Sequence, residues 1–198
     1  MKTRTTAILI IIAIILTSFS IYIFKHTSNK WYYFSETIGT AVFTQSEISN
    51  ATKIIITQPS GKTISLEKKD EIWYVKSSDK IPADKTKIIK FLDALTNIKV
   101  LQNIYTDKMG TENLSLMPPT KKNQTNSGSE IQIFINQNPL SSLIVGKYRH
   151  DNNGINKSET VIGRYMRFKG NFDVFFTDQF LTELSYSSED WINPKKTK

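Results

Sequence analysis

The residues Gly61-Lys62-Thr63 end in the way that a phosphate-binding loop ends. Such a loop needs a glycine five positions before its second glycine, and a helix directly after it, because backbone N–H groups cradle the phosphates. Ile56 stands at the earlier position, and a strand pattern follows. We therefore interpret Gly61-Lys62-Thr63 as a hairpin turn.

The stretch Asp151-Asn152-Asn153-Gly154 is rich in the oxygen donors that calcium prefers. An EF-hand loop places glycine at position 6 and glutamate at position 12. Here glycine comes fourth and Ile162 stands at position 12. We interpret the stretch as a loop between strands, while a surface calcium site of another type stays open.

Histidine and cysteine are too scarce for most catalytic and metal sites. The chain has two histidines, His26 and His150, and no cysteine. Cysteine-ligated metals, thiolate catalysis and disulfides are therefore excluded. No Gly-x-Ser-x-Gly elbow accompanies His150. We expect no catalytic residues, no cofactor and no metal, and therefore a protein that is not an enzyme.

Five aromatic residues on predicted strands could act in one of two ways. They could form a platform that binds a ligand, or they could belong to the core, which is the more common role of aromatic residues in strands. They are Trp73, Tyr74, Tyr165, Phe175 and Phe176.

The basic excess does not indicate nucleic-acid binding. The formal net charge is +8, but Lys2, Arg4 and Lys25 flank a hydrophobic stretch. The other charges are mixed: Lys68 and Lys69 stand among acidic neighbours. A nucleic-acid face would cluster basic residues on one element. We expect no nucleic-acid partner, and the sequence leaves any small-molecule ligand unknown.

Residues Ala7 to Phe24 contain no charge, proline or glycine. As a helix they would span roughly 27 Å, which matches the hydrocarbon core of a bilayer. We predict an uncleaved single-pass anchor; the alternative is a signal peptide cleaved within Thr17–Ser20. The anchor prediction rests on eight residues in particular: Ala7, Ile8, Leu9, Ile15, Leu16, Phe19, Ile23 and Phe24.

The charges beside this stretch favour a cytoplasmic N-terminus, with the bulk of the chain outside the cell membrane. Trp31, Tyr32 and Tyr33 follow closely. They could lie in the interfacial aromatic belt, or they could begin the folded core.

The remainder of the chain predicts an α+β fold. We divide it into a tail at 1–6, the transmembrane helix at 7–24, a connector at 25–50, an extramembrane domain at 51–192 and a basic tail at 193–198. Short strands at Lys53–Thr57, Lys62–Lys68 and Ile72–Val75 predict an antiparallel meander. An apolar stripe after Asp84 predicts a helix that covers it.

A second set of strands resembles the first in order, so two repeated β-meander-plus-helix halves are possible at 53–105 and 130–184. Thr106 to Ser129 reads as a long polar stretch, Tyr148 to Lys157 reads as a polar loop, and Asp178 could cap a short helix through Leu184. The strands predicted in this part are Lys99–Tyr105, Ile131–Ile135, Leu140–Val145 (ending at Gly146), Val161–Phe168 and Phe172–Thr177.

The pattern from Lys53 to Val100, with later pieces up to Trp191, resembles the bacterial domain-of-unknown-function family 4340. The residues that carry this resemblance include Trp73, Pro82, Ala83, Asp84, Gly146, Tyr165 and Trp191. It implies a membrane-anchored extracytoplasmic domain associated with an ABC-transporter complex, and no catalytic residues. We expect a non-enzymatic accessory protein of the bacterial envelope with a protein partner; the alternative is an extracytoplasmic enzyme or ligand receptor acting on glycan or peptide.

Overall fold

The computed structural model divides the chain into two units, Met1–Tyr32 and Tyr33–Lys198. The predicted anchor and the aromatic residues at 31–33 lie outside the described residues, apart from Thr17. No helix in the described part is long and apolar enough to cross a membrane. The structure describes residues 17, 38–76, 81–120, 125–152, 159–171 and 173–192.

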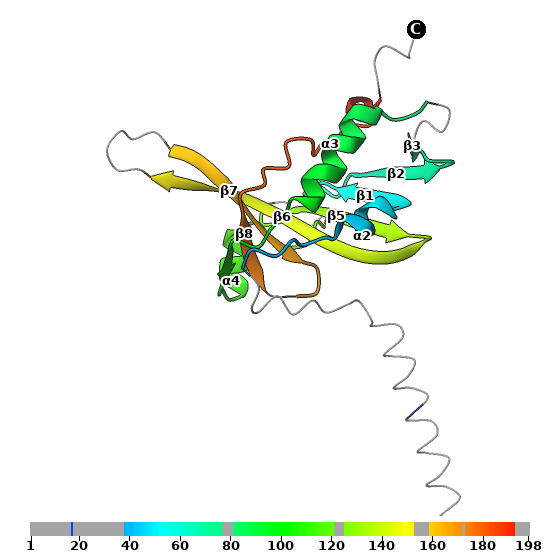
Figure 1. The fold of residues 1–198 in the computed structure, drawn as a ribbon. Helices are drawn as coiled ribbons and strands as arrows, with labels where there is room; N and C mark the ends of the chain where they lie inside the picture. The colour runs from blue at the N-terminus through cyan, green and yellow to red at the C-terminus, as the bar shows by residue number, and fades with distance from the viewer. Residues whose placement is uncertain are drawn as a thin grey trace, which may run out of the picture. The chain divides into compact units, whose positions relative to one another are not determined.

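One antiparallel sheet of eight strands dominates the second unit (Figure 1). The strand order is β3-β2-β1-β5-β6-β7-β8-β4, so both predicted meanders contribute to one sheet. The fold is α+β, as the sequence predicts. The strands are β1 (Lys53–Thr57), β2 (Thr63–Lys69), β3 (Ile72–Val75), β4 (Gln102–Ile104), β5 (Ser129–Ile135), β6 (Asn138–Asn152), β7 (Glu159–Phe168) and β8 (Val174–Thr177). The helices are α2 (Gln45–Ser49), α3 (Lys85–Thr96), α4 (Lys108–Asn113) and the 3-10 helix η2 (Glu189–Trp191).

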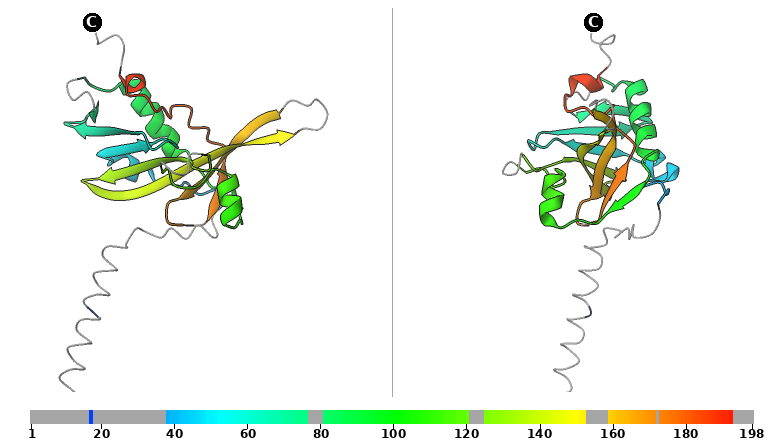
Figure 2. Two further views of the ribbon diagram at one scale, coloured as in Figure 1. Left: turned by 180° about the vertical axis from the view of Figure 1, so that it is seen from behind. Right: turned by 90° about the vertical axis from the view of Figure 1, so that its left-hand side faces the viewer.

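The main core lies between α3 and one face of the sheet (Figure 2). Side chains alternate between the two faces of a strand, so every second residue of β1, β2 and β5 points to this face. The sheet residues that are buried there are Ile54, Ile56, Ile64, Leu66, Ile131 and Ile133; those of α3 are Ile88, Phe91 and Leu95. The period-2 and helical apolar patterns are therefore confirmed.

Helix α3 begins where the sequence predicts. The carboxylate of Asp84 accepts hydrogen bonds from the N–H groups of Thr86 (2.8 Å) and Lys87 (3.3 Å), which satisfies donors that have no partner within the helix. The N–H of Asp84 donates to the carbonyl of Trp191 at 2.7 Å. The fully buried Trp191 ring packs edge-on against Phe91, with 5.3 Å between ring centroids.

A smaller apolar cluster covers the other face of the sheet, near β6, β7 and β8. It consists of Leu116, Ile144 and Val174, packed against Ile104, Leu114 and Tyr165. The buried Arg167 side chain fastens the chain segment over this cluster: Nε donates to the Leu116 carbonyl at 2.6 Å and Nη1 to the Asn171 carbonyl at 2.7 Å. Burial lowers the pKa of the Arg167 guanidinium.

The carboxylate of Glu130 is buried on the same face of the sheet as the Leu116 cluster. Glu130 is 4% exposed and accepts hydrogen bonds from Ser142 Oγ at 2.6 Å and Lys169 Nζ at 2.9 Å. A buried charge needs such partners because desolvation is costly. The trio therefore links β5, β6 and the turn after β7.

Three sequence predictions about elements were wrong. Strand β6 does not end at Gly146 but continues to Asn152, so the predicted polar loop at 148–157 begins as strand. The predicted helix from Asp178 to Leu184 is turn and coil, because Leu181 adopts a left-handed φ of 50°, which an α-helix cannot contain.

The sequence also missed two short helices. Helix α2 lies inside the predicted connector at 25–50, where Thr44 and Glu47 form a capping box. Helix α4 lies inside the long polar stretch after Thr106, capped by Asp107. Both are only one or two turns long, so no apolar period could reveal them.

Replacing Trp191 by Ala should destabilise the domain by about 3–5 kcal/mol, because the substitution leaves a large cavity beside Phe91. Urea unfolding followed by circular dichroism measures this loss. Ile89→Ala is the matched control, since Ile89 is 47% exposed on α3, and should change stability by no more than about 0.5 kcal/mol. Equal effects of the two substitutions would contradict this packing role.

Candidate functional site

The residues that carry the family resemblance gather in two places, and both are structural. The N–H of Ala83 donates to the Trp73 carbonyl at 2.8 Å, and Pro82 forms a bridge with Tyr74 at the outer edge of β3. With Asp84 and Trp191, these residues close the start of α3. Ala83 and Trp191 are buried there, and Trp73, Pro82 and Asp84 are half-buried.

Gly146 and Tyr165 lie at the base of a long hairpin formed by β6 and β7. Gly146 sits in a β-bulge between Val145 and Tyr148. A Cβ atom there would lie 2.5 Å from the Leu114 carbonyl oxygen, so only glycine fits without a shift. The Tyr165 ring lies 6.0 Å from Phe176.

The aromatic residues do not form one platform. Trp73 and Tyr74 lie on β3 at one edge of the sheet, whereas Tyr165, Phe175 and Phe176 lie on β7 and β8, near the other edge. Phe175 and Phe176 are buried, which confirms the core interpretation for these two.

The structure also shows where the phosphate-loop-like and calcium-loop-like stretches lie. Gly61-Lys62-Thr63 lies at the turn between β1 and β2, with Gly61 at a left-handed φ of 83°, so the hairpin interpretation is confirmed. Asp151 and Asn152 pair with Thr160 and Glu159 as strand residues. Within the described ranges, no three or more acidic or histidine side chains gather as metal ligands.

Beyond the bulge, β6 and β7 leave the sheet as a two-stranded ribbon, which we call the arm (residues 147–152 and 159–163). Pairing of β6 with β5 stops at Val145, and pairing of β7 with β8 starts at Arg164. The arm therefore extends away from the body of the domain (Figure 2).

Two arginine–aromatic contacts hold the base of the arm. Arg164 Cζ lies 4.2 Å from the Tyr148 ring centroid, and its Nε and Nη2 donate to the Gly146 carbonyl in the bulge. Arg149 Cζ lies 4.8 Å from the Phe176 ring, and Nη1 donates to Gln102 Oε1 at 2.7 Å. Because residues 148 and 149 are consecutive, these contacts brace opposite faces.

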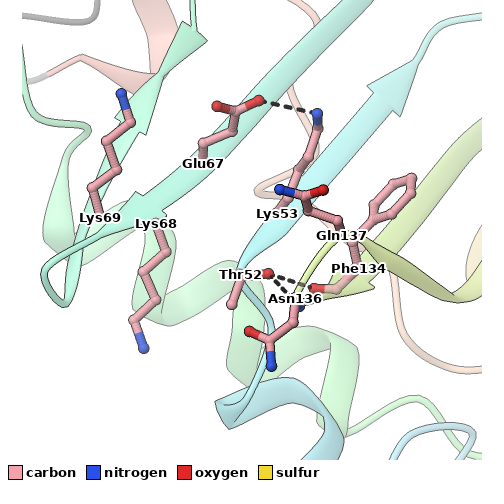
Figure 3. A pocket seen from close by; sticks show the side chains of 8 residues that line it. All are labelled: Thr52, Lys53, Glu67, Lys68, Lys69, Phe134, Asn136 and Gln137. Atoms are coloured by element: carbon pink, nitrogen blue, oxygen red, sulfur yellow. Dashed lines mark hydrogen bonds and ion pairs between the residues drawn. The ribbon is translucent and has the colours of Figure 1, made fainter.

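A polar groove of about 470 Å³ lies at another place, beside the start of β1 (Figure 3). Thr52 organises it: its hydroxyl accepts a hydrogen bond from the Asn136 N–H at 2.9 Å and donates to the Phe134 carbonyl at 3.3 Å. Its lining comprises Thr52, Lys53, Glu67, Lys68, Lys69, Phe134, Asn136 and Gln137.

Two of the three lysines that line the groove are in ion pairs. Lys53 Nζ lies 3.0 Å from Glu67 Oε1, and Lys76 Nζ lies 3.7 Å from the same oxygen. The hydrogen bond from Lys53 lowers the pKa of Glu67 below its ordinary value of 4.5. Figure 3 shows Lys68 and Lys69 pointing in opposite directions, as consecutive strand residues do, and Lys68 pairs with Glu71 at 2.6 Å.

Sequence reasoning found neither the arm nor the groove as a candidate site. It predicted strands at Ile131–Ile135 and Leu140–Val145, but no sequence signal showed that the turn between them lies beside β1. The sequence predicted that the strand ends at Gly146, so it did not predict that β6 continues into the arm. No protein-family model, curated protein or solved structure matches this chain.

The lowered pKa of Glu67 predicts how stability responds to acid. The pair with Lys53 contributes fully above the unfolded pKa of about 4.5 and is lost as pH falls through the lower folded pKa. The difference in Tm between the wild type and Glu67→Gln should therefore be largest near neutral pH and vanish in strong acid. Thermal melts from about pH 7 to about pH 2 check this; a constant difference would contradict it.

Proposed function

We propose that this chain is a non-enzymatic binding protein, tethered to a membrane by Ala7–Phe24, that holds a protein partner with the arm and the neighbouring β4–α4 segment. One observation carries this. Of the seven large hydrophobic side chains that are exposed in the described residues, four lie on these elements: Leu101, Tyr105, Met109 and Tyr148. Tyr105 is 92% exposed and Met109 is 68% exposed.

The arm has the chemistry of a protein interface. Tyrosine and arginine dominate binding hot spots because they combine apolar area with directed hydrogen bonds. Tyr148 is 44% exposed and is flanked by Lys147 and Arg149. Its ring is already held by Arg164 and by Phe180, whose ring centroid is 6.4 Å away. Such pre-organisation reduces the entropy lost on binding.

Strand β4 contacts the arm through the hydrogen bond from Arg149 to Gln102. It is a three-residue strand at the end of the sheet order. Short strands protect a sheet edge from uncontrolled pairing, so the apolar side chains beside it, rather than the edge itself, are the expected contact.

The tether and the resemblance support an envelope role. We propose that the domain lies outside the cytoplasm and that its partner is a membrane complex, with ABC-transporter subunits as the first candidates. A partner in the same membrane is confined to the same surface, which raises its effective concentration. Even a contact of modest area would then be occupied.

Photocrosslinking in the full-length, membrane-embedded protein tests the partner surface. p-Benzoylphenylalanine at Tyr148 or Tyr105 should give a covalent adduct of one defined additional mass, because both side chains would lie within the interface. The same group at Ile89, which is 47% exposed on α3, is the control and should give none. Adducts from Ile89 alone, or none from either tyrosine, would refute the assignment.

The absence of cysteine permits a clean test of orientation. Ser60 is exposed in the turn after β1, so Ser60→Cys should react with a membrane-impermeant maleimide in intact cells. Thr3→Cys should react only after the membrane is permeabilised. The reverse pattern would place the domain in the cytoplasm.

A further inference from the structure

The groove beside β1 plays no part in the proposed partner surface, and its side chains form a distinct chemical set. We propose that this groove is a binding site for a neutral saccharide, with one sugar ring lying against Phe134. The residues assigned to contact it lie on three strands and in the turn between β5 and β6: Lys53, Glu67, Phe134 and Gln137 (Figure 3).

The polar groups match a sugar because hydroxyls both donate and accept hydrogen bonds. Glu67 offers carboxylate oxygens, Lys53 offers N–H donors, and the Gln137 amide offers both. Lys53 and Glu67 lie 3.0 Å apart, so neighbouring hydroxyls of one ring could contact an acceptor and a donor together. A few converging polar groups beside an apolar wall are typical of small-ligand sites.

Phe134 supplies the apolar wall. It is only half-buried, and Lys53 Nζ lies 5.9 Å from its ring centroid. The face of an aromatic ring carries partial negative charge, which attracts the weakly positive C–H groups on one face of a pyranose. The ring and the ion pair therefore lie close enough to contact the same sugar.

Ion pairs occupy two of the three lysines that line the groove. Lys53 pairs with Glu67, and Lys68 pairs with Glu71 in the hollow that adjoins the groove, so Lys69 is the lining lysine without an ion pair among the described residues. A phosphate or nucleic-acid site would present several unpaired cations. A neutral, hydroxyl-rich molecule therefore fits the groove better than an anion does.

Gln137 adds an amide to the lining of the groove. Asn136 and Gln137 both adopt left-handed φ angles, 48° and 68°, in the two-residue turn between β5 and β6. Glycine is the preferred residue at the second position of such a turn, so a glutamine there is strained. Gln137 is exposed and lines the groove, so its amide can contact a ligand there.

The strain makes possible a test in which loss of binding cannot come from unfolding. Gln137→Gly should raise Tm by about 2 °C through relief of the left-handed backbone, and should weaken saccharide binding at least about tenfold through loss of the amide contacts. Ser115→Gly is the control. Ser115 also has a left-handed φ, of 54°, and does not line the groove, so its replacement should raise Tm but leave binding unchanged.

The full chain is purified in an amine-oxide detergent, which has no sugar headgroup, and titrated with maltotriose, cellotriose and chitotriose by calorimetry and ligand-observed NMR. Binding of at least one trisaccharide that inorganic phosphate does not displace supports the site. Phe134→Leu, which keeps an apolar side chain but removes the aromatic ring, should weaken that binding about tenfold. Binding of none of the three, displacement by phosphate, or full binding by Gln137→Gly would overturn it. Because the crosslinking positions lie on other elements, partner binding and saccharide binding can fail separately.

Discussion

The β-bulge in β6 is the constraint on which the shape of the domain depends. Before it, β6 is a central strand with neighbours on both sides; after it, the strand pairs with β7 alone. The bulge is stable because Gly146 permits the close approach of Leu114 and because Arg164 satisfies its carbonyl. Without these contacts an unpaired carbonyl would remain at the base of the arm, at a cost of about 1–3 kcal/mol.

A second constraint acts at the other end of β6. The turns at Asp70-Glu71 and Asn136-Gln137 both use left-handed backbone without glycine. Two-residue turns of this kind match the twist of an antiparallel pair, which explains their geometry but not their residues. Thr52 ties them together, because its backbone N–H donates to Phe134 and its carbonyl accepts from Lys68. The groove is therefore a fixed product of the strand order.

Local patterns in the sequence predicted the strands of the first meander, the Asp84 cap and α3. These depend on neighbours within a few residues, so the sequence contains them. The sheet order was not accessible, because β5 pairs with β1 across some 75 residues of chain, as Ile56 opposite Ile131 shows. The groove arises from this non-local pairing, so no motif could reveal it, whereas the arm is a hairpin between the consecutive strands β6 and β7. Gly146 was misleading because glycine marks bulges as well as strand ends.

Packing and exposure are separated within this sheet. The face beneath α3 carries the large buried side chains, with Trp191, Phe91 and Leu95 all fully enclosed. The features that cost stability lie elsewhere: exposed Tyr105 and the strained Gln137 contribute little to packing. Proteins retain strained or exposed residues when the rest of the fold compensates, and such residues concentrate at functional positions. Gln137 lines the groove and Tyr105 follows β4, so strain and exposure occur at both of the proposed contact surfaces.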